Sequence, residues 1–322
     1  MHTLSLRALR AALFVSAASL SIAAQAQDAT ALPPIDAEDE AAVGLAVPPV
    51  TTRELTRDAL RRRQAGTSDT ADLLRQIPGV SVNTGGGFSS MPVLRGLSEQ
   101  RLTILVDGRP IDAACPNDMN PPLSYTDPQT VAAIRVIPGV SPVSMGGDNI
   151  GGVIAVDSAR PRFATEPGTL ATGEVSAFYR SNGDGFGGAA SLTLASESLS
   201  ATYTGSYTTS DQYEGGGHKS LVRSTEYRKT DHALALAWQN GAGLFRLKGG
   251  IHFSPYEGFA NQAMDMVSNR SWFISGGYDG VFDWGTVTLN ADYRDTDHKM
   301  DFLEDKRPGA MPMFTEVHSL DT

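Results

Sequence analysis

The side chains best suited to chemistry in this sequence are soft metal donors at two widely separated places. Cys115 and Met119 lie in one short segment, and His298 and Met300 lie far downstream. Thiolate, thioether and imidazole together favour copper over hard cations that prefer oxygen ligands, and they favour Cu(I) more than Cu(II). This donor set predicts that the chain handles a metal ion.

The beginning of the chain indicates that the cysteine belongs to an exported protein. Arg7 and Arg10 precede an apolar run over residues 11–24, and a small-residue cleavage site follows, which predicts a signal peptide over residues 1–26. Cys115 is the single cysteine of the sequence. In an oxidising compartment three roles are open to it: a small buried apolar side chain, an intermolecular link or a metal ligand.

The composition excludes two broad classes of protein. The 322 residues include 33 glycines and 41% apolar residues, and the formal net charge is −10. These values fit neither a disordered chain nor a protein that binds nucleic acid through a basic patch, so no nucleic-acid partner is expected. After residue 26 no apolar run is long enough for a transmembrane helix. If the mature chain spans a membrane, it does so with strands.

From about residue 169 onward, apolar and polar residues alternate with the period of two that is typical of β-strands. A soluble sandwich can alternate in this way too. Aromatic residues near the strand ends, and tight turns alternating with long connections at 209–225 and 254–270, favour an outer-membrane barrel. The pattern predicts seven strands, at residues 169–181, 185–195, 198–209, 226–240, 243–254, 271–282 and 284–300.

Seven strands do not close a barrel, because bacterial single-chain barrels use even strand numbers from about eight upward. The chain also ends at Thr322 without a recognisable closing strand. We therefore expect the sequence to be an N-terminal fragment of a longer barrel protein.

A different segment, roughly residues 52–160, precedes the strands and reads as a compact mixed domain with a short helix at 70–76. In it, Asp107-Gly108 predicts a tight hairpin turn and Gly151-Gly152 predicts close backbone packing. Three stretches resemble, in order and spacing, the plug domain of TonB-dependent outer-membrane receptors. They are DLLRQIPGV at 72–80, LRG through LVDGRP at 94–110, and IRVIPG through GGDNIGGVI at 134–154.

This resemblance implies an α+β plug domain followed by the first strands of a transmembrane antiparallel β-barrel, which has 22 strands in the family. It implies the outer membrane of a Gram-negative bacterium, contact with outer-membrane lipid, a TonB–ExbB–ExbD complex as energising partner, and no enzyme activity. The expected divisions are a signal peptide at 1–26, a periplasmic linker and candidate TonB-contact segment at 27–51, the plug at 52–160, and about seven barrel strands at 161–322.

Within that family, the cysteine segment resembles copper receptors of the OprC and NosA type. In these receptors a Cys-x-x-x-Met element of the plug meets a His-x-Met element of the barrel. Cys115 and Met119 match the first element, and His298 and Met300 match the second. The resemblance implies import of copper that arrives as an ion or on a carrier protein.

Strand parity tests this assignment independently. If Val287, Leu289 and Tyr293 face lipid, the even-numbered positions of the last predicted strand face the lumen. His298 and Met300 are both even-numbered, so both should face the lumen, where a plug loop can meet them. Counting strands from the periplasmic plug places them toward the cell exterior.

Further methionines recur at a spacing of two residues. Met264 and Met266 are expected in a long outer loop, and Met311 and Met313 lie near the end of the chain. They form either a secondary soft-metal track or ordinary hydrophobic packing. Two alternatives to a copper receptor remain open: a receptor for an iron siderophore or cobalamin, in which Cys115 is incidental, and a surface-binding protein that does not transport.

Overall fold

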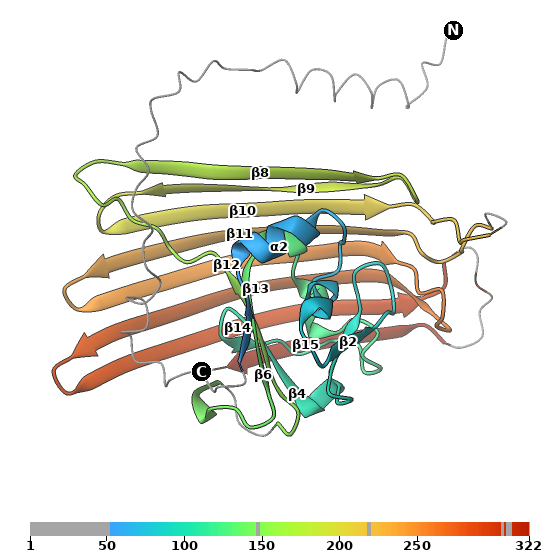
Figure 1. The fold of residues 1–322 in the computed structure, drawn as a ribbon, viewed down its shortest axis with the longest axis horizontal. Coiled ribbons are helices and arrows are strands. Elements are labelled where there is room, and N and C mark those ends of the chain that lie inside the picture. Colours follow the sequence, from blue (N-terminus) through green and yellow to red (C-terminus); the bar gives the residue numbers. More distant parts are fainter. Residues whose placement is uncertain (1–51, 146–148, 218–219, 304–305, 307–310, 322) are drawn as a thin grey trace, which may run out of the picture. The chain divides into compact units, whose positions relative to one another are not determined.

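The computed structural model describes residues 52–145, 149–217, 220–303, 306 and 311–321. The predicted signal peptide and linker, residues 1–51, lie outside this range. Two structured parts follow one another along the described chain, a mixed α+β part and a long antiparallel sheet (Figure 1). No helix among the described residues is long and apolar enough to cross a membrane.

The mixed part corresponds to the predicted plug. Its main sheet has the order β1-β6-β7-β4-β5, in which β4 and β7 run parallel and the other neighbours run antiparallel. A hairpin of β2 (Val80–Asn83) and β3 (Met91–Leu94) stands beside it. The sheet strands are β1 (Arg53–Leu55), β4 (Leu102–Val106), β5 (Arg109–Pro110), β6 (Val131–Pro138) and β7 (Gly152–Ser158).

The hairpin turn and the close backbone packing expected from the sequence are both present in this sheet. Asp107 and Gly108 both have positive φ, 52° and 78°, in the turn that joins β4 to β5. Gly152 has φ 121°, and a Cβ there would lie 2.1 Å from the carbonyl oxygen of Ile137. Only glycine allows β7 to pair so closely with β6 at this point.

The helices of the plug differ from the prediction. The helix expected at residues 70–76 is a 3₁₀ helix, η2 (Ala71–Gln76), whose Leu73 and Leu74 are buried in the plug core. An α-helix, α2 (Arg57–Gln64), was not predicted, because only Leu60 of its apolar residues is buried. Asp58 in its first turn and arginines in its last turn complement the helix dipole.

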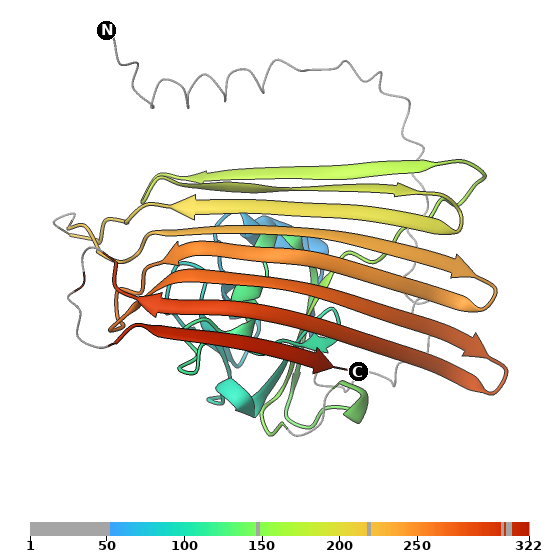
Figure 2. The ribbon, with the colours of Figure 1, turned by 180° about the vertical axis from the view of Figure 1, so that it is seen from behind.

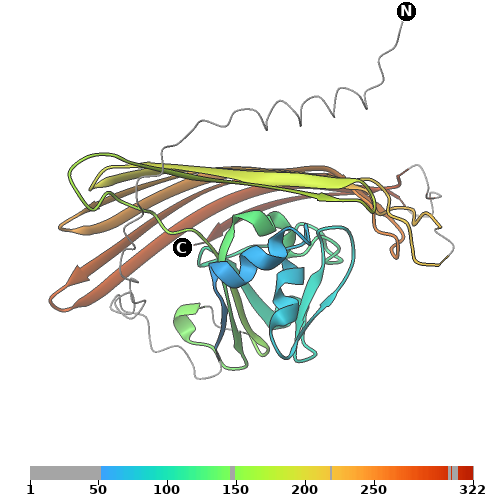
Figure 3. The same cartoon turned by 45° about the horizontal axis from the view of Figure 1, so that its top comes forward.

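The second part is a single sheet of eight strands in sequence order, all antiparallel, which Figures 2 and 3 show from behind and tilted. Seven of them lie close to the predicted ranges. The strands are β8 (Leu170–Arg180), β9 (Gly185–Ala195), β10 (Leu199–Ser210), β11 (Tyr227–Asn240), β12 (Gly243–Glu257), β13 (Asp265–Phe282), β14 (Gly285–Asp301) and β15 (Met313–Asp321).

Two details of the strand prediction are wrong. The connection expected at 254–270 spans only 258–264, because β12 continues to Glu257 and β13 begins at Asp265. An eighth strand, β15, pairs with β14, so the described sheet has eight strands and not about seven. The sheet is open, with β8 and β15 at its edges, as expected for the first part of a barrel.

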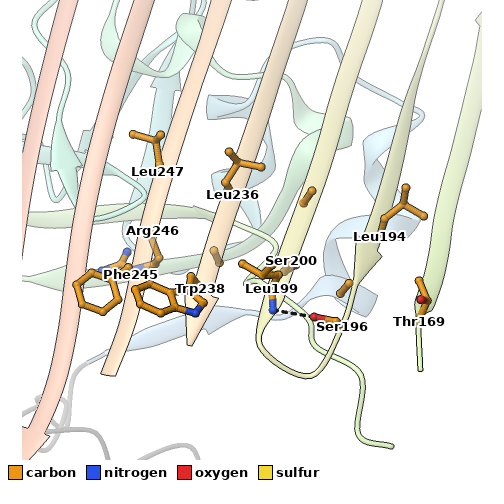
Figure 4. A pocket seen from close by; sticks show the side chains of 13 residues that line it. Thr169, Leu194, Ser196, Leu199, Ser200, Leu236, Trp238, Phe245, Arg246 and Leu247 are labelled. Carbon is orange, nitrogen blue, oxygen red and sulfur yellow. Dashed lines mark hydrogen bonds between the residues drawn. The ribbon is translucent and has the colours of Figure 1, made fainter. Parts of the chain in front are cut away.

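One face of the sheet is apolar and exposed. Large side chains such as Val175, Leu234 and Leu289 are half or more exposed on it, which is the pattern of a lipid-facing surface. An apolar groove crosses β9 to β12 near their tight turns, and Trp238 and Phe245 stack at its edge (Figure 4).

The opposite face of β14 is buried over its outer half. Even-numbered positions from Asp292 to Met300 are buried, whereas odd-numbered positions between them are at least partly exposed. The predicted parity of His298 and Met300 is therefore confirmed, since both lie on the face away from lipid.

A plug loop, residues 84–90, fits tightly against Glu257 at the end of β12. A Cβ on Gly86 would lie 2.1 Å from Oε1 of Glu257. Glu257 cannot move aside cheaply, because it is buried and its carboxylate accepts bonds from Phe88 N at 2.9 Å and Ser89 Oγ at 2.6 Å. We expect Gly86→Ala to destabilise the plug by about 1–3 kcal/mol.

The measurement is the urea midpoint of plug unfolding in detergent-solubilised protein. Gly241→Ala is the matched control, since a Cβ at Gly241 meets no atom within 4 Å. Equal midpoints for Gly86→Ala and wild type would contradict this packing of the loop.

Candidate metal site

The plug contributes its two predicted donors from the segment between β5 and the 3₁₀ helix η4 (Pro122–Tyr125). A turn closes over residues 115–118, where Asp118 N donates to the carbonyl oxygen of Cys115 at 3.0 Å and Asp118 has φ 49°. Cys115 and Met119 are buried, with exposed fractions of 1% and 9%. The turn therefore carries both sulfur side chains into the protein interior.

The strands contribute the other two donors from the outer part of β14. Met300 lies opposite Met266 of β13 on one side and Met313 of β15 on the other. His298, two residues earlier on the same face, lies opposite Asn269 of β13. A row of three methionines thus crosses three neighbouring strands directly beside the histidine.

A pair of asparagine side chains joins the plug segment to these strands. Asn269 Nδ2 donates to Asn120 Oδ1 at 3.0 Å, and Asn120 Nδ2 donates to Ser89 Oγ at 3.2 Å. Asn120 directly follows Met119, and Asn269 is the residue opposite His298. The buried amide pair therefore positions the two donor segments next to each other.

Sulfur side chains from both parts meet in one buried cluster. Cys115 and Met119 of the plug pack there with Met264, Met266 and Met300, around the rings of Phe88, Tyr227 and Phe259. Met313 is partly buried against this cluster. Three of the four predicted ligands thus belong to one cluster, and His298 extends from the neighbouring position on the same face of β14.

His298 is the electrostatically unusual member of the set. Its side chain is 1% exposed, and neither Nδ1 nor Nε2 has a hydrogen-bond partner among the described residues. A buried polar group without a partner is costly. An imidazole beside thioethers is also a copper ligand, and a bound ion would satisfy one of its nitrogens.

No group of three or more His, Cys, Asp and Glu side chains suited to a metal ion occurs in the described part of the chain. A metal site here therefore depends on methionine sulfur, which selects soft ions over zinc or calcium.

The additional methionines are divided between two environments. Met264 and Met266 are buried in the sulfur cluster, and neither lies in a long exposed loop. Met311 is 85% exposed, whereas Met313 packs against the cluster. Any secondary track through these residues would run from the exposed Met311 through the partly buried Met313 to the buried Met300 and Met266.

Charged side chains connect the plug to strands β11, β12 and β14. Lys229 of β11 is fully buried, donates to Thr126 O at 2.8 Å and lies 4.9 Å from the centre of the Phe88 ring. Nearer the tight-turn ends of the strands, Lys248 pairs with Asp107 at 2.6 Å and Arg109 pairs with Asp292 at 3.7 Å. The sequence analysis missed these residues and the Asn120–Asn269 pair, although several lie on the lumen parity of their strands.

Residues 46–153 match the family model described as the TonB-dependent Receptor Plug Domain. The structure is similar to that of the copper transporter OprC, with TM-score 0.71 and 27% identity, covering 83% of this chain and 41% of that one. It is also similar to the ferric enterobactin receptor PfeA of Pseudomonas aeruginosa, with TM-score 0.62 and 17% identity, covering 84% and 45%.

A curated hemin receptor of Yersinia pestis is 32% identical over 101 residues, which is 30% of this chain and 14% of that protein. The chain thus spans less than half the length of the proteins to which it is similar. These proteins are receptors and transporters and not enzymes.

The matches agree with the two parts of the described fold. Residues 46–153 match the plug-domain model, and β8–β15 resemble the first strands of the barrel in the similar structures. This architecture is that of an outer-membrane protein of a Gram-negative bacterium.

The stability of the plug should depend on pH through one buried carboxyl group, that of Asp69. Burial raises the pKa of Asp69 to about 6, and hydrogen bonds from Ser90 and from Ala71 N offset part of that rise. Between the ordinary carboxyl pKa and about 6, the folded plug holds a proton that the unfolded chain has lost. Plug stability should therefore fall as pH rises through this window, by on the order of 3 kcal/mol.

The free energy of unfolding of the plug, measured from pH 4 to pH 8 for wild type and Asp69→Asn, tests this expectation. The variant should lack the fall and should be the more stable of the two at neutral pH. A difference between the two proteins that stays constant with pH would show that Asp69 ionises normally.

Proposed function

We propose that this protein is a TonB-dependent outer-membrane receptor that binds copper from the cell exterior and imports it. Cys115, Met119, His298 and Met300 would hold the ion, with Cu(I) favoured over Cu(II). The observation that carries the proposal is a buried cluster of sulfur side chains from plug and strands beside an imidazole without a partner among the described residues.

The chemistry of the cluster favours copper over an organic iron chelate. A pocket for such a chelate needs an open volume, whereas this place is buried, and its thiol and thioether groups pack directly against the rings of Phe88, Tyr227 and Phe259. Soft ligands bind Cu(I) well and bind iron(III) and zinc less well. The similarity to a copper transporter at 27% identity supports the same choice.

The division of the ligands between two parts of the chain suggests how the ion is released. Cys115 and Met119 belong to the plug, whereas His298 and Met300 belong to β14. If the plug moves when the TonB–ExbB–ExbD complex pulls on the chain before it, the two plug ligands separate from the two strand ligands. The affinity of the site for copper then drops at the moment of transport, although no ligand is chemically changed.

The methionines at 264, 266, 311 and 313 extend this proposal toward the exterior. Met311 would meet the ion first, and Met313 and Met266 would flank Met300 on the neighbouring strands. Thioethers bind copper without a proton to lose, so such a row could pass the ion inward at any external pH. Outer-membrane lipid would cover the opposite, apolar face of the sheet, including its groove.

The direct test is Cu(I) binding by wild type and Cys115→Ala in competition with a chromophoric chelator. We expect the variant to lose at least about tenfold in affinity, since it lacks the strongest sulfur ligand. Met91→Leu is the matched control, because Met91 lies on β3 outside the sulfur cluster. Equal Cu(I) affinity in wild type and Cys115→Ala would refute the copper site.

Metal selectivity gives a second, independent test. In equilibrium competition, Zn²⁺ and Fe³⁺ should displace Cu(I) only weakly, because the proposed site offers two thioethers and a thiolate. The measurement is the Cu(I) retained after dialysis against each competing ion. Retention of iron as firmly as copper would favour the iron-chelate receptor instead.

A further inference from the structure

A second buried imidazole on the lumen-facing side of the sheet has an arrangement typical of metal ligands. His252 of β12 is 3% exposed, and its Nε2 has no hydrogen-bond partner among the described residues. Its Nδ1 lies 2.7 Å from Oδ1 of Asp231 on β11. A carboxylate that accepts the Nδ1 proton fixes the tautomer and leaves the Nε2 lone pair free, which is how proteins orient histidines for metals.

An ordinary ion pair explains this geometry less well. A protonated His252 would carry a second N–H at Nε2, and that donor would be buried with no acceptor in the described part of the protein. The neutral tautomer instead presents a lone pair that an incoming cation can use. Two cationic side chains face the His252–Asp231 pair. Lys229 interacts electrostatically with Asp231. Arg294 lies 5.8 Å from the ring of Tyr125, which packs against His252.

The strand register places His252 closer to the tight-turn end of the sheet than His298 of the candidate copper site, by two residues along the strands. His252 lies opposite Ser271, and Ser271 lies opposite Thr296, two residues before His298. The two histidines are therefore separated by about 7 Å along the strands and about 10 Å across them. His252 is the nearer of the two to the tight turns, which face the periplasm in outer-membrane barrels.

The same plug segment covers both histidines. The ring of Tyr125 lies 5.2 Å from that of His252, and the Tyr125 hydroxyl is near Asn269 and the main chain of Ala114. Asn269 in turn bonds Asn120 and lies opposite His298. The segment from Ala114 to Tyr125 therefore extends from the sulfur cluster to His252.

We infer that His252 Nε2 is the strand ligand of a second soft-metal site, which receives Cu(I) from the first site on its way inward. The inference rests on the proposed function and adds a residue to its path. One oriented imidazole makes a weaker site than four soft donors, and a conducting path needs later sites that release the ion readily. No bond other than metal coordination forms or breaks in this step.

The experiment titrates Ag(I), a redox-inert soft analogue of Cu(I), into detergent-solubilised protein labelled with ¹⁵N at its histidines. Two steps are expected. The first equivalent shifts the ring nitrogen signals of His298, and the second, weaker equivalent shifts Nε2 of His252. His252→Gln should lose only the second step, whereas Cys115→Ala should weaken the first.

Two further variants sharpen the test. Asp231→Asn should retain the His252 signal and weaken the second step by about 10–100-fold, because the carboxylate orients the ring. His232→Gln is the matched control, since His232 bonds Tyr203 at 2.8 Å on the exposed side of the sheet, and it should change neither step.

The outcomes separate the two proposals. A His252 signal that does not move at any silver concentration, with the first step intact, would overturn the inference and leave the copper site standing. A first step that is equally strong in wild type and Cys115→Ala would instead refute the copper site itself.

Discussion

The candidate site depends on one contact, the burial of plug sulfur against the lumen-facing side of β13 and β14. Cys115 and Met119 reach this place because the Asn120–Asn269 pair fixes the plug segment against the strand opposite His298. Both amides are fully buried, so a shift of the segment would leave polar atoms without partners. The same contact closes the sulfur cluster and holds the two halves of the candidate ligand set together.

Ion pairs and hydrogen bonds deeper in the structure have a different role from that of the cluster. Lys229, Lys248 and Arg109 connect the plug to strands far apart in sequence. Such partly or fully buried polar contacts add specificity of position more than net stability, because desolvation offsets much of their attraction. Contacts of this kind keep the plug in one position in the resting protein. Because their net stabilisation is small, a pulling force can still separate the plug from the strands.

Much of the fold could be predicted from the sequence, because alternation at period two directly reports which face of a strand meets lipid. The strand ranges, the Asp107-Gly108 turn and the parity of His298 and Met300 all followed from local patterns. β15 was not predicted, because the sequence between the end of β14 and Met313 shows no regular alternation of apolar and polar residues. α2 was missed because it buries little apolar surface, so its periodicity is weak.

The donor residues of the candidate site could be predicted from the sequence, whereas the residues that surround them could not. Residue type and parity identified the sulfur and imidazole groups, whereas contacts such as Asn120 with Asn269, or Asp231 with His252, join residues that no local pattern relates. Only tertiary structure reveals that both imidazoles are buried, each with a nitrogen that has no hydrogen-bond partner in the described part of the chain. No sequence motif marks His252, and the proposal for it rests on its burial and its strand register.

The most direct test of the central claim is X-ray absorption at the copper edge of protein loaded with one equivalent of Cu(I). If plug and strand ligands converge on one ion, the first coordination shell contains both sulfur and imidazole nitrogen. A shell of nitrogen and oxygen alone, with no sulfur scattering, would contradict the account.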